Sequence, residues 1–207
     1  MHELLLDRGW ASTQVVTQNE FIELSRSLGT PWSRSGRIVD QLVVRDRKEA
    51  PALSLSGIYG RGEFPLHTDY AHHIVPPRFV LLRFAGTDPV RPTMLLPFAS
   101  LDLTADELGI LKRRVWLVRG GPIAFYAPVL SNWDVRVRWD AGCMFPRPLG
   151  SDAVRTWTQC LCKAAAHEFH WAPNATLVID NWRTLHGRAG VDMETDSARM
   201  LERIVVS

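Results

Sequence analysis

The sequence predicts a mainly β fold, a barrel or sandwich with helices packed outside. Two observations support this prediction: many short apolar segments are separated by Gly, Pro, Asp and Asn, and only three segments have a helical pattern. The expected strands span residues 36–44, 66–69, 78–84, 93–97, 115–119, 135–139, 176–179, 184–186 and 199–206. Because no repeat or linker interrupts the chain, residues 1–207 are expected to form a single domain.

The three expected helices flank these strands. They span residues 18–28, 104–113 and 152–169. Capping boxes of the form T-x-x-E mark the first two starts, Thr17 with Glu20 and Thr104 with Glu107. Gly29 ends the first helix, and an apolar stripe at helical spacing predicts the third.

Composition excludes several classes of protein. Hydrophobic residues make up 46% and charged residues 22%, as in ordinary globular proteins, so global disorder is not expected. A net charge of +2 without a basic run argues against a nucleic-acid partner. No apolar stretch reaches the roughly 18 residues of a membrane span, and the N-terminus does not read as a signal peptide. Three cysteines, an odd number, argue against a disulfide framework, so we expect a cytoplasmic protein with no membrane partner.

The segment FPLHTDYAHH, residues 64–73, places His67 and Asp69 two residues apart on an expected strand. Side chains at this spacing share one face, so an imidazole and a carboxylate point into one space. His186, which follows the apolar strand 176–179, can supply a third ligand. Two histidines and one carboxylate on one side of a metal are typical of non-haem Fe(II) oxygenases.

The last expected strand carries two arginines on one face. Arg199, Leu201, Arg203 and Val205 alternate along it. Inward-facing arginines are costly unless they meet anionic partners. A guanidinium can bind a carboxylate through two N–H groups, so the strand indicates that the barrel holds an anion.

Several segments resemble the taurine dioxygenase/clavaminate synthase-like family of Fe(II)- and 2-oxoglutarate-dependent oxygenases. They are NEFIELSRSLGTPW (19–32), FPLHTD (64–69), PPRFVLLRF (76–84), RPT (91–93), DNWRTLHGR (180–188) and ARMLERI (198–204). The resemblance implies a double-stranded β-helix (jelly roll) in which His67, Asp69 and His186 hold iron. It also implies that Arg199 and the hydroxyl of Thr93 bind 2-oxoglutarate, with O2 as the second cosubstrate.

The resemblance further implies an activity. We expect hydroxylation, desaturation or cyclisation at an unactivated C–H of a small molecule, such as an amino-acid-like or natural-product intermediate, with release of succinate and CO2. The carboxylate of Asp69 favours oxygenation over halogenation, because the family's halogenases lack it.

Other polar residues have weaker assignments. Arg203 is a candidate either for binding an anion in the pocket or for pairing with a structural acid, and Arg83 and Arg188 are lesser candidates of the same kind. His167 and His170 are expected on the third helix, where a charge near the helix end is favourable. Four residues are expected near the pocket or in its loops: Tyr59, Tyr70, His72 and His73.

Two alternative functions remain open from the sequence. A Zn²⁺-dependent hydrolase could use the same three ligands with an activated water, but it leaves Arg199 and Arg203 unexplained. A non-catalytic jelly-roll module could keep the fold for ligand binding, but the intact set of three ligands argues against it.

Overall fold

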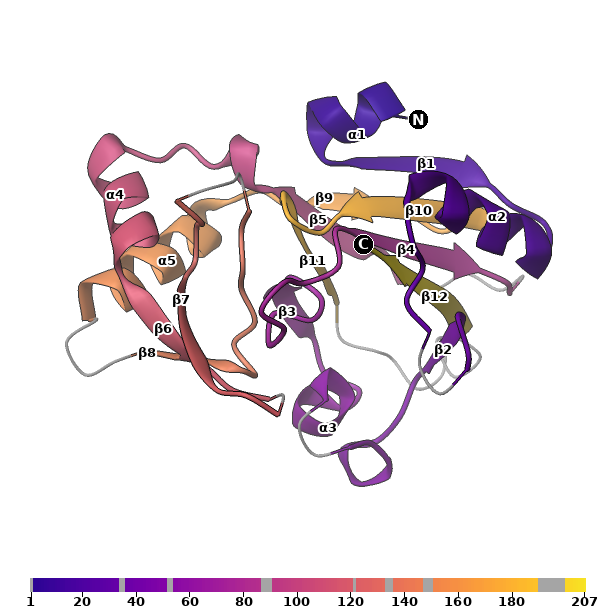
Figure 1. Cartoon of the computed structure of the whole chain (residues 1–207), viewed down its shortest axis with the longest axis horizontal. Coiled ribbons are helices and arrows are strands. Elements are labelled where there is room, and N and C mark those ends of the chain that lie inside the picture. Colours follow the sequence, from indigo (N-terminus) through magenta and orange to yellow (C-terminus); the bar gives the residue numbers. More distant parts are fainter. Residues whose placement is uncertain are drawn as a thin grey trace.

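Three antiparallel sheets build the molecule in the computed structural model (Figure 1). The structure describes residues 2–33, 36–51, 54–86, 91–120, 122–132, 136–146, 151–189 and 200–207. The first sheet has the order β1 (Trp10–Gln14), β10 (Ala175–Asp180), β4 (Phe79–Phe84), β12 (Met200–Val206), β2 (Asp40–Val43). The second has the order β3 (Phe64–His67), β11 (Thr184–Arg188), β5 (Thr93–Pro97), β9 (His167–Phe169). The third has the order β7 (Phe125–Pro128), β6 (Val115–Val118), β8 (Met144–Pro146).

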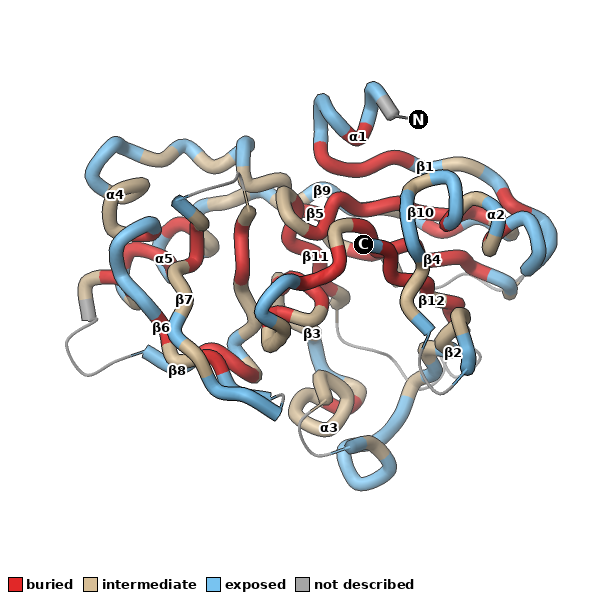
Figure 2. The backbone as a smooth tube through the Cα atoms, in the orientation of Figure 1, coloured by how far each residue is buried: buried red, intermediate tan, exposed pale blue. Residues whose placement is uncertain are grey.

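The first two sheets enclose an apolar core between them. Leu82 of β4, Val205 of β12 and Leu95 of β5 are buried together in it. Figure 2 shows the buried backbone concentrated along β4, β10, β11 and β12. The mainly β fold with flanking helices is therefore confirmed, and the two facing antiparallel sheets form the expected double-stranded β-helix.

Most of the helices pack against the outside of a sheet. Their bounds are α1 (His2–Arg8), α2 (Gln18–Leu28), α3 (Leu55–Tyr59), α4 (Ala105–Arg113) and α5 (Ser151–Lys163), with 3₁₀ turns η1 (Arg47–Glu49) and η2 (Phe98–Ser100). Phe21 of α2 packs with Ile204 and Val206 on the outer side of β12. Trp157 of α5 packs with residues of β6 and β8 beneath the third sheet. No helix among the described residues is long and apolar enough to cross a bilayer.

Both capping boxes are confirmed at the starts of α2 and α4. The Thr17 and Thr104 hydroxyls accept hydrogen bonds from the backbone N–H groups of Glu20 and Glu107, and both glutamates bond back to their cap. Each pair satisfies backbone donors that the first turn of a helix leaves free. This local chemistry fixes the two helix starts at the expected residues.

The helix expected over 152–169 is wrong in its last turn and a half. The helix ends at Lys163, and residues 167–169 form β9, which pairs with β5 through Thr93 and Phe169. His167 therefore lies on a strand and stacks on Trp10, with ring centroids 4.9 Å apart. Sheet pairing and aromatic packing outweigh the helical propensity of the preceding alanines.

The strand expected at 135–139 is also wrong in extent. Among its described residues, Val137 forms only an isolated bridge to Leu130. The strand expected at 66–69 is confirmed as β3 but ends at His67, so Asp69 lies beyond it.

A buried ion pair ties β4 to β12 on the side of the sheet that faces α2. Arg83 donates through Nε and Nη2 to Glu202 at 2.8 Å each, and through Nη1 to the Val16 carbonyl at 2.7 Å. Glu202 also accepts from Gln18 at the start of α2. Arg83 is therefore part of the scaffold: of the two roles expected for it, the structure shows pairing with a structural acid.

Replacing Arg83 with Met should destabilise the fold. The change leaves the Glu202 carboxylate buried without its cation, which costs about 3–5 kcal/mol in the free energy of unfolding. Urea denaturation measures this quantity. Arg26→Met is the control, because Arg26 pairs with Glu23 on the exposed surface of α2 and should change stability by less than about 1 kcal/mol. Equal effects of the two substitutions would contradict the structural role of Arg83.

Candidate metal centre

The strand register brings the two histidines of the site together. His67 on β3 and His186 on β11 are directly opposite partners in an antiparallel pair. Directly opposite residues project from the same face of a sheet. Their ring centroids are accordingly 4.5 Å apart, although 119 residues separate them in the chain (186 − 67).

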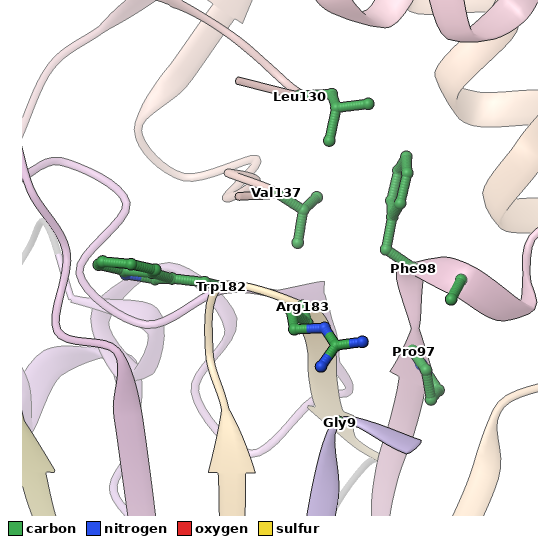
Figure 3. Close-up of a pocket in the computed structure, with 8 residues that line it drawn as sticks. Gly9, Pro97, Phe98, Leu130, Val137, Trp182 and Arg183 are labelled. Carbon is green, nitrogen blue, oxygen red and sulfur yellow. The ribbon is translucent and has the colours of Figure 1, made fainter. Parts of the chain in front are cut away.

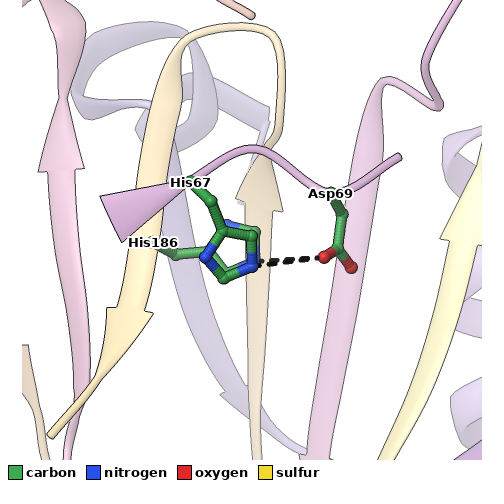
Figure 4. A group of neighbouring side chains, drawn as sticks. All are labelled: His67, Asp69 and His186. Carbon is green, nitrogen blue, oxygen red and sulfur yellow. Dashed lines mark ion pairs between the residues drawn. The ribbon is translucent and has the colours of Figure 1, made fainter. Parts of the chain in front are cut away.

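Asp69 completes the group from the turn after β3. Its Oδ1 lies 3.5 Å from Nε2 of His67 and 3.7 Å from Nε2 of His186 (Figure 4). All three side chains are buried, and their ligand atoms lie within 4.8 Å of one another. No other group of three such residues is found in the described part of the chain.

The hydrogen bonding of His67 suits metal binding. Its Nδ1 lies 2.8 Å from the Pro65 carbonyl, which can only accept, so Nδ1 carries the proton. In the neutral imidazole, the lone pair of Nε2 then faces the centre of the group. Two imidazole nitrogens and one carboxylate oxygen converging in this way fit a divalent metal such as Fe(II) with positions left open.

Electrostatics keep the carboxylate charged and one histidine neutral. Burial opposes the charge of Asp69, but Arg203 and the two histidines outweigh it and hold its pKa well below the usual range. Burial, reinforced by His67, lowers the pKa of His186. Burial also opposes a charge on His67, but hydrogen bonding and attraction to Asp69 outweigh it and raise that pKa. An ionised carboxylate and a neutral imidazole are the forms that bind metals.

Asn181 fixes the backbone of Asp69. Its side-chain oxygen accepts from the Asp69 N–H at 2.7 Å, and its Nδ2 donates to the carbonyls of Asp69 at 3.0 Å and Pro77 at 2.9 Å. The side chain is fully buried in the turn between β10 and β11. One amide therefore links the two halves of the site. The sequence places Asn181 shortly after the strand expected at 176–179, but its partner 112 residues away could not be inferred.

Asn181→Leu should weaken metal binding without removing a ligand. The change keeps the side-chain size but leaves the Asp69 N–H without its acceptor, so the carboxylate loses its fixed position. Loss of such a supporting residue typically weakens metal affinity by about 10–100-fold. Anaerobic titration with Fe(II) measures the effect. Asn132→Leu, at an exposed asparagine that bonds a helix carbonyl, is the control; equal affinity in the two variants would contradict the role of Asn181.

Residues 138–139, which the sequence did not assign to the site, support the turn and loop around Asp69. The Thr68 N–H donates to the Trp139 carbonyl at 2.6 Å, and the Trp139 N–H donates back to Oγ1 of Thr68 at 3.0 Å. The neighbouring Arg138 is buried and donates to three carbonyls of the loop after Asp69, those of Ala71, His73 and Ile74. The only signal for it was the alternation of arginines in VRVRWD.

Of the residues assigned to the cosubstrate, Thr93 and Arg203 lie on different sheets, on β5 and β12 respectively. Thr93 is buried on β5 opposite Arg188, and its Oγ1 accepts from Nε1 of Trp171 at 3.1 Å. Arg199 lies outside the described residues. Arg203 contacts Asp69 itself, with its Nη1 2.9 Å from Oδ2. The structure therefore places Arg203 at the metal site with an acid as its partner.

The remaining candidates take up packing positions. The guanidinium of Arg188 lies 3.9 Å from the centre of the Phe64 ring and donates to the carbonyls of Gly60 and Gly62. His72 and His73 are half-buried in the loop after Asp69. Four rings contact one another in or near that loop: Trp32 with Tyr70 and His73, and His72 with Tyr70 and His73. Tyr59 of α3 forms a separate pair with Phe64. His170 follows β9 and pairs with Glu168, so the expected helical pair with His167 is wrong.

A separate small cavity opens beside η2 (Figure 3). Its lining is mostly apolar and consists of Gly9, Pro97, Phe98, Ala99, Leu130, Val137, Trp182 and Arg183. None of the three metal-site residues borders it. The Arg183 guanidinium donates to the Leu6 carbonyl at 2.7 Å and so binds helix α1.

The fold and the site define a jelly-roll protein with a buried centre of two histidines and one aspartate. The family model for taurine catabolism dioxygenase TauD, TfdA family, matches residues 137–205, which include His186 and Arg203. This match confirms that the chain resembles the taurine dioxygenase/clavaminate synthase-like family. A comparison with curated proteins found no match.

Solved structures share the fold over the whole chain. The non-haem iron oxygenase OrfP, in complex with Fe and α-ketoglutaric acid, is 20% identical, with a TM-score of 0.74 over 100% of this chain and 77% of its own. An asparagine oxygenase is 19% identical, with a TM-score of 0.77 over 99% and 77%. PvcB from Pseudomonas aeruginosa is 15% identical, with a TM-score of 0.73 over 99% and 78%.

Proposed function

We propose that the protein is a non-haem Fe(II)- and 2-oxoglutarate-dependent dioxygenase that oxidises an unactivated C–H of a small molecule. The observation that carries this proposal is the convergence of two Nε2 atoms on one buried oxygen of Asp69, at 3.5 and 3.7 Å. The family match supports it, as do the Fe, α-ketoglutaric acid and succinate bound in OrfP structures of the same fold. When bound, Fe(II) with 2-oxoglutarate and O2 supplies the oxidising chemistry, with succinate and CO2 as by-products.

The chain's own residues position the reactants. His67, Asp69 and His186 would hold the metal from one side and leave the other side for cosubstrate and O2. Thr93, on the strand beside β11, would hydrogen-bond 2-oxoglutarate, and Arg199 would pair with its distal carboxylate. The surrounding core keeps water from the site, which strengthens each charge interaction within it.

An amino-acid-like molecule is the proposed substrate. OrfP has been solved with (3S)-hydroxy-L-Arg, and the asparagine oxygenase with a hydroxyasparagine. Both carry a hydroxyl on a free amino acid, so free amino acids and their derivatives are the first class to test. We also propose a cytoplasmic location, which is supported by three free cysteines, two of them buried.

Succinate formation tests the function. The protein is incubated aerobically with Fe(II), 2-oxoglutarate and a panel of free L-amino acids, and both succinate and substrate mass are measured. The proposal predicts one substrate that raises succinate formation above the substrate-free rate and gains one oxygen atom. His186→Ala should show neither. Equal succinate formation in parent and variant, or a panel of this class without any coupled product, would contradict the proposal as stated.

A further inference from the structure

Arg203 divides its guanidinium between two carboxylates. Its Nη1 donates to Oδ2 of Asp69 at 2.9 Å, and its Nη2 donates to Oδ2 of Asp40 at 3.0 Å. Nη2 also lies 3.3 Å from the Tyr70 hydroxyl, and the guanidinium carbon lies 5.3 Å from the centre of the Tyr70 ring. The Asp69 oxygen that Arg203 contacts is the one turned away from the two histidines.

The sheet register builds the contact between Arg203 and Asp40. The two residues are directly opposite partners on β12 and β2, so their side chains leave the same face of the sheet. Leu201 and Val205, which share this face of β12, pack in the core between the two sheets. Asp40 and Arg203 therefore project toward the metal centre from the sheet opposite β11. Glu202, which directly precedes Arg203 on β12, projects from the other face of the sheet.

The charge of Arg203 is already matched before any ligand arrives. One guanidinium meets two carboxylates, and when Asp69 is committed to a divalent metal, Asp40 alone still offsets the charge of Arg203. The side chains of Arg203 and Asp40 are 18% and 31% exposed, so solvent screens their pair only in part. An anionic group entering beside Arg203 would also approach Asp40, and like charges at close range are strongly unfavourable.

One donor of Arg203 remains unused among the described residues. Its Nε is buried and has no hydrogen-bond acceptor there. A buried N–H gains most from one acceptor, and a neutral carbonyl or hydroxyl oxygen provides it without adding charge. A neutral oxygen beside Arg203 therefore meets no charge repulsion from Asp40, whereas an anion does.

We infer that Asp40 is a specificity-determining residue, which neutralises Arg203 and so excludes substrates that place an anionic group there. The substrate class is then an amino-acid-like molecule that presents a neutral carbonyl or hydroxyl oxygen to Arg203. The statement about substrates rests on the proposed oxygenase function. The charge pairing itself is tested without metal or cosubstrate.

The test uses inorganic sulfate as the anion. Asp40→Asn keeps the shape of the side chain and an oxygen acceptor but removes its charge. Sulfate is titrated into the parent and Asp40→Asn proteins by calorimetry. Since a hydrogen bond to a charged group is strong, releasing Arg203 should tighten sulfate binding by about 10–100-fold. The double variant Asp40→Asn, Arg203→Gln should lose this gain.

Asp46→Asn is the matched control. It removes the same charge from an exposed aspartate that pairs with Arg61 at 2.8 Å, outside the metal site. Equal gains in the Asp46→Asn and Asp40→Asn proteins would show a general charge effect and overturn the inference, as would unchanged sulfate binding in a folded Asp40→Asn protein. If Asp40→Asn does not fold, Asp40→Ser serves the same purpose. Failure of the oxygenase proposal would instead appear as absent substrate-dependent succinate formation.

Discussion

His186→Ala is expected to reduce Fe(II)-dependent turnover to background. The substitution removes one of three ligand atoms that lie within 4.8 Å of one another, so the metal keeps only His67 and Asp69. Loss of a supporting residue already lowers metal affinity about 10–100-fold, and loss of a ligand should cost more. Anaerobic Fe(II) titration and succinate formation are the two measurements.

The control for this prediction is His170→Ala, which removes an exposed histidine outside the site. Circular dichroism should show both variants folded, because His186 contributes to a site at the edge of the core. Parent-like Fe(II) affinity and turnover in a folded His186→Ala protein would contradict the assignment of the three ligands.

Arg199→Ala should produce the second largest effect, on 2-oxoglutarate binding. The prediction comes from the sequence, because Arg199 lies outside the described residues. Without this arginine the distal carboxylate of 2-oxoglutarate is buried unpaired, at a cost of roughly 2–5 kcal/mol. The affinity for 2-oxoglutarate should fall by a factor of about thirty to several thousand. Arg199→Lys should recover only part, since an ammonium cannot reproduce a two-pronged contact.

Titration of 2-oxoglutarate into the Fe(II) forms decides this prediction. Arg26→Ala, on the exposed surface of α2, should bind the cosubstrate like the parent. Unchanged affinity in Arg199→Ala would contradict the assignment. A loss seen only in Arg203→Ala would move the role four residues along the same face of the last strand.

The site was more predictable from sequence than its surroundings. His67 and Asp69 are close in the chain, and His186 lies on β11, the strand that pairs with β3. Pattern and resemblance together therefore identified all three side chains. The same holds for the two capping boxes, whose partners are three residues apart. Local chemistry of this kind leaves a local signature.

Long-range partners left no such signature. The acids around Arg203 come from positions 163 and 134 residues away, and the sequence could only require that some anion be present. The amide of Asn181 and the guanidinium of Arg138 reach backbone carbonyls, which every residue possesses. Residues 167–169 became a strand because β5 offers a free edge there, and helical propensity alone could not reveal that edge.

The central claim is that this site binds Fe(II) and 2-oxoglutarate together. The most direct measurement is visible absorption during addition of 2-oxoglutarate to the Fe(II) protein without O2. The account predicts a weak visible charge-transfer band that requires both additions, is lost in His186→Ala, and does not form when Zn²⁺ replaces Fe(II). A protein that binds Fe(II) but develops no band at saturating 2-oxoglutarate would contradict the account and favour a hydrolase or a ligand-binding module.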